Sequence, residues 1–155
     1  MPHIHEKVDF VADVFIVYQD KVLLRMHDKY NIWLVPGGHI ELDEDPVQAV
    51  IREAKEEAGL DIELMGTVPP IPDVEEWSRS ELLPPVFMNR HRISPTHEHI
   101  SLTYFATSKN DHVVPSGDDV SNEWRWVTDK ELDAMDLLPN IRHYAKAALK
   151  AARNQ

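Results

Sequence analysis

Residues 45–59 carry a nearly complete set of signals for one helix, and no other segment limits the choice of fold as strongly. Asp45 is a good capping residue, Pro46 suits the first helical position, and Gln48 follows the cap by three residues, as a capping box requires. Gly59 suits the helix end. The apolar positions between these signals form one stripe: Val47, Val50, Ile51, Ala54 and Ala58. A helix with one apolar face must pack on another layer, so the sequence predicts a layered domain.

Several other segments alternate between apolar and polar residues, as half-buried strands do. The expected strands are residues 8–18, 22–25, 62–68, 86–93, 100–106 and 123–127. Pro36-Gly37-Gly38 and the proline-rich segment 69–85 predict loops. Thr128 and Pro139 predict the starts of two late helices. Strands before, between and after helices indicate an α/β or α+β domain.

Length, charge and cysteine content narrow the class of protein. A chain of 155 residues favours a single domain, here 1–155 with a core over about residues 8–150. The net charge of −11 suits cation binding and argues against partners that need a basic patch, namely nucleic acid and membrane surfaces. The absence of cysteine excludes a disulfide scaffold, a thiolate zinc site and a cysteine nucleophile. We therefore expect a soluble, cytoplasmic protein.

Acidic residues are concentrated around the predicted helix. Residues 41–63 hold nine acids and two bases, so this segment carries most of the net charge. At 3.6 residues per turn, Glu53, Glu56 and Glu57 share one helix face, away from the apolar stripe. Each like-charge pair at this spacing costs about 0.2–0.5 kcal/mol. A hard divalent cation such as Mg²⁺, which prefers oxygen ligands, would offset that repulsion. The alternative is a solvated acidic face.

The spacing of these residues resembles the Nudix box, G-x5-E-x7-R-E-U-x-E-E-x-G-U, where U is a bulky aliphatic residue. Gly38, Glu44 and the run 52–60 match every polar and glycine position of the motif, and Ala54 is smaller than the family's usual aliphatic residue. The resemblance covers about residues 8–150. It implies an α/β Nudix fold, an α/β/α sandwich around a mixed β-sheet. It also implies hydrolysis of a nucleoside diphosphate linked to another moiety X.

The resemblance further implies roles for individual residues. The implied Mg²⁺ ligands, with Mn²⁺ as a substitute metal, are Glu53, Glu56, Glu57 and a backbone carbonyl of Gly37 or Gly38. Glu53 and Glu56 are also candidates for the general base. Arg52 would orient a glutamate through its four-residue spacing to Glu56, and we count it with the catalytic residues.

Residues outside the box give weaker signals. Glu98, in the segment 96–99, is expected to supply a carboxylate from a neighbouring loop, either as general base or as a further metal ligand. Substrate contacts are expected from arginines that could clamp phosphates and from an aromatic ring that could stack on a base: Arg25, Arg90, Arg92 and Phe87. Solvated arginines and core packing are the alternatives.

Three histidines, His91, His97 and His99, fall close together in the sequence. No cysteine and no helical His-x-x-x-His pair accompanies them, so the sequence does not favour a zinc site there.

Three functional classes remain in competition. The leading hypothesis is a Mg²⁺-dependent pyrophosphohydrolase whose partner is a small nucleotide. An isoprenyl-diphosphate isomerase of the same fold would need a catalytic cysteine, which the chain lacks. A non-catalytic Nudix-like sensor of nucleotide ligands is the alternative, against which the intact box argues. Nucleoside triphosphates, nucleotide sugars and ADP-ribose all stay open as substrates, and so does assembly as a homodimer.

Overall fold

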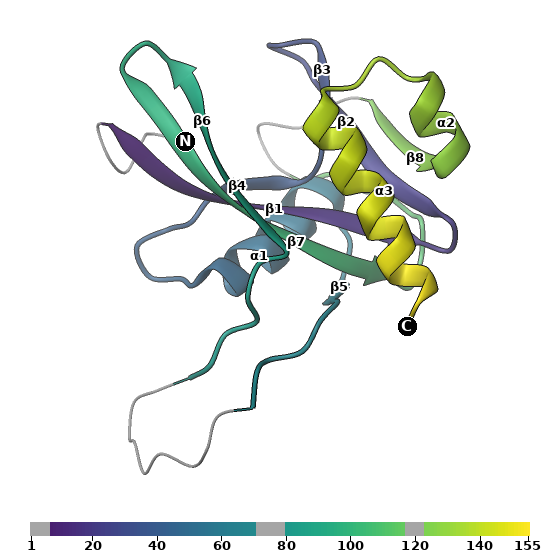
Figure 1. Cartoon of the computed structure of the whole chain (residues 1–155), viewed down its shortest axis with the longest axis horizontal. Coiled ribbons are helices and arrows are strands. Elements are labelled where there is room, and N and C mark those ends of the chain that lie inside the picture. Colours follow the sequence, from purple (N-terminus) through teal and green to yellow (C-terminus); the bar gives the residue numbers. More distant parts are fainter. Residues whose placement is uncertain (1–6, 71–79, 117–122) are drawn as a thin grey trace.

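The computed structural model describes residues 7–70, 80–116 and 123–155 of the chain, and within them one helix lies between two runs of strands and two further helices follow the second run (Figure 1). The strands are β1 Val8–Tyr18, β2 Lys21–His27, β3 Ile32–Leu34, β4 Gly37–His39, β5 Ile62–Leu64, β6 Phe87–Ser94, β7 His97–Ser108 and β8 Trp124–Thr128. The helices are α1 Pro46–Ala58, α2 Asp129–Ala134 and α3 Pro139–Arg153. Among the described residues, none of these helices has the length and apolar character needed to cross a membrane.

The described strands form one mixed sheet. Its main path runs β3-β2-β1-β7-β5, while β4 pairs with β1, β6 with β7, and β8 with β2. The central pair, β1 and β7, is parallel and runs from Val8 opposite Glu98 to Val17 opposite Thr107. The other pairs are antiparallel.

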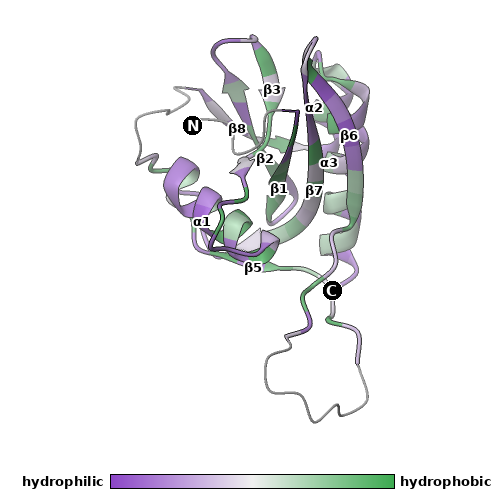
Figure 2. Cartoon of the chain, turned by 90° about the vertical axis from the view of Figure 1, so that its left-hand side faces the viewer, coloured by the Kyte–Doolittle hydropathy of each residue, from purple (hydrophilic) through white to green (hydrophobic). Residues whose placement is uncertain are grey.

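Helices cover both faces of this sheet, with α1 on one side and α3 on the other (Figure 2). Successive side chains of β1 point to opposite faces of the sheet, which explains why the core has one layer on each face. Phe15 and Val17 point to the face covered by α3, whereas Val14 and Ile16 point to the face covered by α1. The expected α/β/α arrangement around a mixed sheet is therefore confirmed.

The residues expected to cap the helix over 45–59 do so in α1. The Asp45 carboxylate accepts hydrogen bonds from the backbone N–H groups of Val47 (2.8 Å) and Gln48 (2.9 Å). The Gln48 side chain in turn accepts from the Asp45 N–H at 2.9 Å, which completes the capping box. Gly59 ends the helix in the left-handed conformation, with φ of 71°. Ile51 was wrongly assigned to the apolar stripe, because it is 45% exposed.

One expected loop and one expected strand need correction, whereas the described part of the loop expected over 69–85 is confirmed. Gly37 and Gly38 belong to β4 and pair with Asp13 and Ala12, so the Pro36-Gly37-Gly38 segment is not a loop throughout. The strand expected over 62–68 ends at Leu64. In the segment 69–85, residues 71–79 lie outside the described part of the chain, and the remainder has no regular structure up to the bend before β6.

Candidate functional site

One arginine organises the carboxylates of α1 and of the turn before it. The Arg52 side chain donates through Nε and Nη2 to the two carboxylate oxygens of Glu44, at 3.0 and 2.6 Å. Its Nη1 donates to Glu53 at 2.8 Å and to Glu56 at 3.2 Å, and its Nη2 also reaches the backbone carbonyl of His39 at 3.1 Å. A planar guanidinium can hold several carboxylates in this way because its donors are fixed. The expected contact between Arg52 and Glu56 is present, and Arg52 positions two further carboxylates.

Glu53 lies against the backbone of Gly38. Its residue is 6% exposed, and a Cβ atom placed on Gly38 would stand 2.3 Å from Glu53 Oε1. Only glycine leaves room for the carboxylate at this position. Burial raises the pKa of Glu53, and the hydrogen bond and charge of Arg52 oppose that effect.

Glu57 contacts the same strand from the next turn of α1. Its Oε2 accepts a hydrogen bond from the Gly37 N–H at 2.9 Å, and its Oε1 lies 2.8 Å from Arg25 Nη1. Arg25 was expected to clamp phosphate, and in the structure its guanidinium pairs with this glutamate. The phosphate role of Arg25 stays a prediction.

Two of the three glutamates of the acidic stripe therefore contact one short strand, β4. Glu53 and Glu57 touch the Gly38 and Gly37 backbone, while the Glu56 side chain is 55% exposed and open to solvent. Carboxylate and carbonyl oxygens in this arrangement form the donor set that hard divalent cations prefer. Because they supply oxygen ligands, the three glutamates and the β4 backbone fit a Mg²⁺ site.

Apart from Arg25 on β2, the candidate residues beyond the box lie on the β6–β7 hairpin. Glu98 belongs to β7 and not to a loop, and its carboxylate pairs with Arg90 and lies 4.0 Å from Arg92 Nε. The expectation of a free loop carboxylate at Glu98 is thus wrong, although its catalytic role stays a prediction. Phe87 stacks on Tyr144 of α3, with ring centroids 4.3 Å apart. A base-stacking role for Phe87 also stays a prediction.

Polar residues inside β1 escaped the sequence analysis. Asp9 is 1% exposed, and the Asp13 carboxylate accepts a hydrogen bond from the Ser101 hydroxyl. Burial raises the pKa of Asp13. The available signal was that positions 9 and 13 share the side of the strand on which Phe15 is buried. A carboxylate on such a face needs a partner.

Glutamine at position 53 is expected to change the pH dependence of stability in metal-free buffer. The native state holds the Glu53 proton more tightly than the unfolded state, so the free energy of unfolding falls as pH rises from about 4.5 through the raised pKa. Glu53→Gln removes this loss, and urea denaturation over a pH series should show the variant gaining on wild type across that window.

Glu44→Gln is the matched control with the opposite sign. The hydrogen bonds from Arg52 lower the pKa of Glu44, so its ionised form stabilises the fold above the unfolded pKa, and this contribution is lost as pH falls. Glu44→Gln should therefore lose stability relative to wild type as pH rises through its unfolded pKa. If the difference in unfolding free energy from wild type varied with pH in the same way for both variants, the opposite pKa shifts given to Glu53 and Glu44 would be contradicted.

Comparison with known proteins finds relatives that are similar in sequence. Two curated relatives are RNA pyrophosphohydrolases. That of Acidiphilium cryptum (strain JF-5) is 32% identical over 107 residues, which is 66% of this chain and 61% of the relative. That of Roseobacter denitrificans (strain ATCC 33942 / OCh 114) is 30% identical over 121 residues, covering 76% of this chain and 69% of the relative. The chain thus spans less than two thirds of the first relative's length.

Solved structures agree with the sequence relatives. A NUDIX family hydrolase from Clostridium perfringens is 34% identical, with a TM-score of 0.80 over 93% of this chain and 97% of that chain. An ADP-ribose pyrophosphatase from Streptococcus suis 89-1591 is 21% identical, with a TM-score of 0.61 over 94% of this chain and 92% of that one, a likeness of fold alone. The family model of the NUDIX domain matches residues 9–149. The chain therefore belongs to the NUDIX domain family.

Proposed function

We propose that this protein is a Mg²⁺-dependent pyrophosphohydrolase that cleaves a nucleoside diphosphate linked to another moiety X. The observation that carries the proposal is the convergence of Glu53 and Glu57 on the backbone of Gly38 and Gly37. Carboxylates gathered at a strand backbone favour a cation in addition to the two arginines that pair with them, and the missing Cβ of Gly38 leaves room for the Glu53 carboxylate. The residues that would hold the ion are Glu53, Glu56, Glu57 and the carbonyl of Gly38.

The chemistry of the substrate explains why such a site is needed. A diphosphate repels anionic nucleophiles, so its hydrolysis requires positive charge at the phosphoryl oxygens and an activated water. When bound, Mg²⁺ supplies that charge and makes a water molecule more acidic. Mn²⁺ favours the same oxygen ligands and is the expected substitute.

The residues of the chain would divide the remaining work. Arg52 holds Glu44, Glu53 and Glu56 in fixed positions, which limits the motion of the carboxylates during the reaction. Glu56 is exposed enough to accept a proton from an attacking water, and Glu53 is the alternative base. Glu98 could take part only after it exchanges its ion pair with Arg90.

The names of the relatives widen the choice of substrate. Beside the two RNA pyrophosphohydrolases, a relative from Lactococcus lactis subsp. cremoris (strain MG1363), 26% identical over 101 residues, is a probable DHNTP pyrophosphohydrolase. The net charge of −11 weighs against a long RNA substrate. A triphosphate with a small X group is therefore our first choice, ahead of RNA, ADP-ribose and nucleotide sugars.

A substrate panel tests this proposal. Purified protein is assayed with Mg²⁺ against nucleoside triphosphates, DHNTP, ADP-ribose, nucleotide sugars and a 5′-triphosphorylated RNA, with products identified by mass spectrometry. Release of a nucleotide fragment from one class, abolished by a chelator, is the expected result. Tight binding of a nucleotide without turnover of any panel member would instead favour the non-catalytic sensor.

Mg²⁺ is expected to raise the melting temperature of the protein. Without metal, Arg25 and Arg52 offset part of the repulsion among Glu53, Glu56 and Glu57. A ligand that binds only the native state adds RT ln(1 + [L]/Kd), which is about 2.7 kcal/mol at a hundredfold excess over Kd. Differential scanning fluorimetry with and without millimolar Mg²⁺ measures the shift.

The control for the thermal shift is a variant with all three glutamates changed to glutamine. Glu53→Gln/Glu56→Gln/Glu57→Gln keeps the shape of the side chains and removes their charge, so its shift should be much smaller. Equal shifts in both proteins would place the stabilising cation elsewhere.

A further inference from the structure

A second group of ionisable side chains gathers where β1, β4 and β7 meet. Asp9 comes from β1, His39 from β4, and His97 and His99 from β7. The parallel pairing places Asp9 opposite His99, and the antiparallel pairing places His39 opposite Val11, two residues along β1. We call these four residues, Asp9, His39, His97 and His99, the His–Asp cluster.

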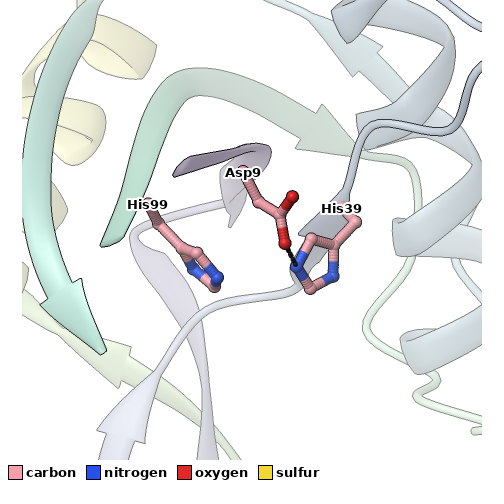
Figure 3. Close-up of side chains that lie close together, drawn as sticks. All are labelled: Asp9, His39 and His99. Carbon is pink, nitrogen blue, oxygen red and sulfur yellow. Dashed lines mark ion pairs between the residues drawn. The ribbon is translucent and has the colours of Figure 1, made fainter. Parts of the chain in front are cut away.

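The cluster is compact and withdrawn from solvent. Asp9 is 1% exposed and His97 is 6% exposed. Asp9 Oδ2 lies 3.2 Å from His39 Nε2 and 3.3 Å from His97 Nε2. One nitrogen each of His39 and His99 and an oxygen of Asp9 all lie within 4.8 Å of one another. In Figure 3 the rings of His39 and His99 lie on either side of the Asp9 carboxylate.

These separations match those between the ligands of a small metal ion. With metal–ligand bonds of about 2.0–2.1 Å, neighbouring ligands of a tetrahedral zinc ion are about 3.3–3.4 Å apart. Both measured distances from Asp9 to a histidine nitrogen fall at that value. The ring centroids of His39 and of His97 are each 5.1 Å from that of His99, so the imidazole of His99 lies beside both of these rings.

We propose that the His–Asp cluster binds a first-row transition-metal ion, for which Zn²⁺ is the representative, and that this ion ties β1, β4 and β7 together. Imidazole nitrogens with one carboxylate favour such ions, whereas Mg²⁺ prefers oxygen ligands throughout. The site uses none of the glutamates of α1, so it is separate from the Mg²⁺ site of the proposed function. Asp9, His39 and His99, whose ligand atoms lie within 4.8 Å of one another, would supply three protein ligands, and His97 contacts the Asp9 carboxylate and would hold it in place.

The burial of Asp9 supports a cation at this place. A carboxylate withdrawn this far from water is stabilised by positive charge, and the imidazole nitrogens of His39 and His97 lie 3.2 and 3.3 Å from its Oδ2.

The proposed ion would also support the acidic site through one strand. His39 follows Gly38 in β4, and its backbone carbonyl accepts a hydrogen bond from Arg52 at 3.1 Å. A metal bound to the His39 side chain fixes β4 from one side while α1 contacts it from the other. The cluster is thus a structural element next to the catalytic residues and takes no part in the reaction itself.

The test measures Zn²⁺ binding directly, in excess Mg²⁺ so that the acidic site is occupied. Protein freed of metal with a chelator is dialysed against Zn²⁺, and bound zinc is counted by elemental analysis. We expect one Zn²⁺ per chain in wild type and in the variant with Glu53, Glu56 and Glu57 changed to glutamine. His99→Ala should weaken binding by at least about 100-fold, the upper end of the loss caused by removing an outer-shell partner.

Two more variants control for misfolding and for Zn²⁺ binding to histidines outside the cluster. Asp9→Asn keeps the size of the side chain and removes its charge, so it replaces His99→Ala if that variant does not fold by circular dichroism. His112→Ala removes an exposed histidine outside the cluster and should bind as wild type does. Substituted Co²⁺ should give the intense visible absorption of a tetrahedral ion in wild type and lose it in Asp9→Asn.

Three results would overturn the proposal. Undiminished Zn²⁺ binding in both cluster variants would place the ion elsewhere, and its loss in the glutamine variant would place it on α1. Absence of Zn²⁺ and Co²⁺ binding in wild type would leave the cluster as a hydrogen-bonded network. None of these results bears on Mg²⁺-dependent turnover, so the failure of this inference and that of the proposed function are distinguishable.

Discussion

Replacing Glu56 by glutamine is expected to lower kcat by about 10²–10⁴-fold, the range contributed by a general base. The structure explains why Glu56 is the more exposed of the two candidate bases. Its side chain is 55% exposed, whereas Glu53 is packed against Gly38. The fold should tolerate the change, since an exposed ion pair such as that with Arg52 contributes less than about 1 kcal/mol. Steady-state kinetics on the panel substrate and urea denaturation measure the two effects.

Glu63→Gln serves as the matched control, because it removes an exposed glutamate on β5 outside the acidic stripe. It should leave kcat within about twofold of wild type. The free energy of unfolding should also change by less than about 0.5 kcal/mol, as is usual for surface substitutions. If Glu56→Gln retained full turnover, Glu56 would lose its role and Glu53 would become the base.

Alanine substitutions at the two adjacent glycines of β4 are expected to have different effects. At Gly38 the new Cβ meets the end of the Glu53 side chain at 2.3 Å, so the carboxylate must move. At Gly37 it meets the backbone of β1, at 2.6 Å from the Ala12 oxygen and 2.8 Å from the Asp13 Cα. Side-chain rotation relieves the first clash but not the second.

Gly38→Ala should therefore lower kcat by about 10²-fold or more, the effect of displacing a reacting group by about 1 Å, with a modest loss of stability. Gly37→Ala should lose unfolding free energy near the upper end of the range of about 1–3 kcal/mol for overpacking. Paired measurements of kcat and urea denaturation distinguish the two. A Gly38→Ala variant with wild-type kcat would show that the Glu53 position is not critical.

The local features of the chain could be predicted from its sequence. The caps of α1 and the second capping box, at Thr128 and Glu131, depend on residues three positions apart, and both form as expected. The spacing of the Nudix box likewise named the glutamates that meet at β4. These predictions succeed because each depends on a few neighbouring residues.

The pairings that cross the chain could not be predicted in the same way. Two adjacent glycines are poor strand formers, and β4 exists because β1 offers its backbone hydrogen bonds. The phosphate role expected for Arg25 stays a prediction, and its ion pair with Glu57 is a contact between distant residues that no local pattern predicts. The His–Asp cluster draws on residues up to 90 positions apart, from Asp9 to His99, and only His97 and His99 among its members lie close together in the sequence.

The parallel pairing of β1 with β7 has a consequence for how the chain folds. Val8 pairs with Glu98 and Val17 with Thr107, so the central strand finds its main partner only after some ninety further residues have been synthesised. At about 5–20 residues per second, that interval lasts several seconds on the ribosome. During this time β1 has one long edge unpaired and apolar side chains on both faces, which is the condition under which nascent chains aggregate. We therefore expect substitutions that weaken β7 to lower the yield of folded protein during expression more than substitutions on the exposed face of α1.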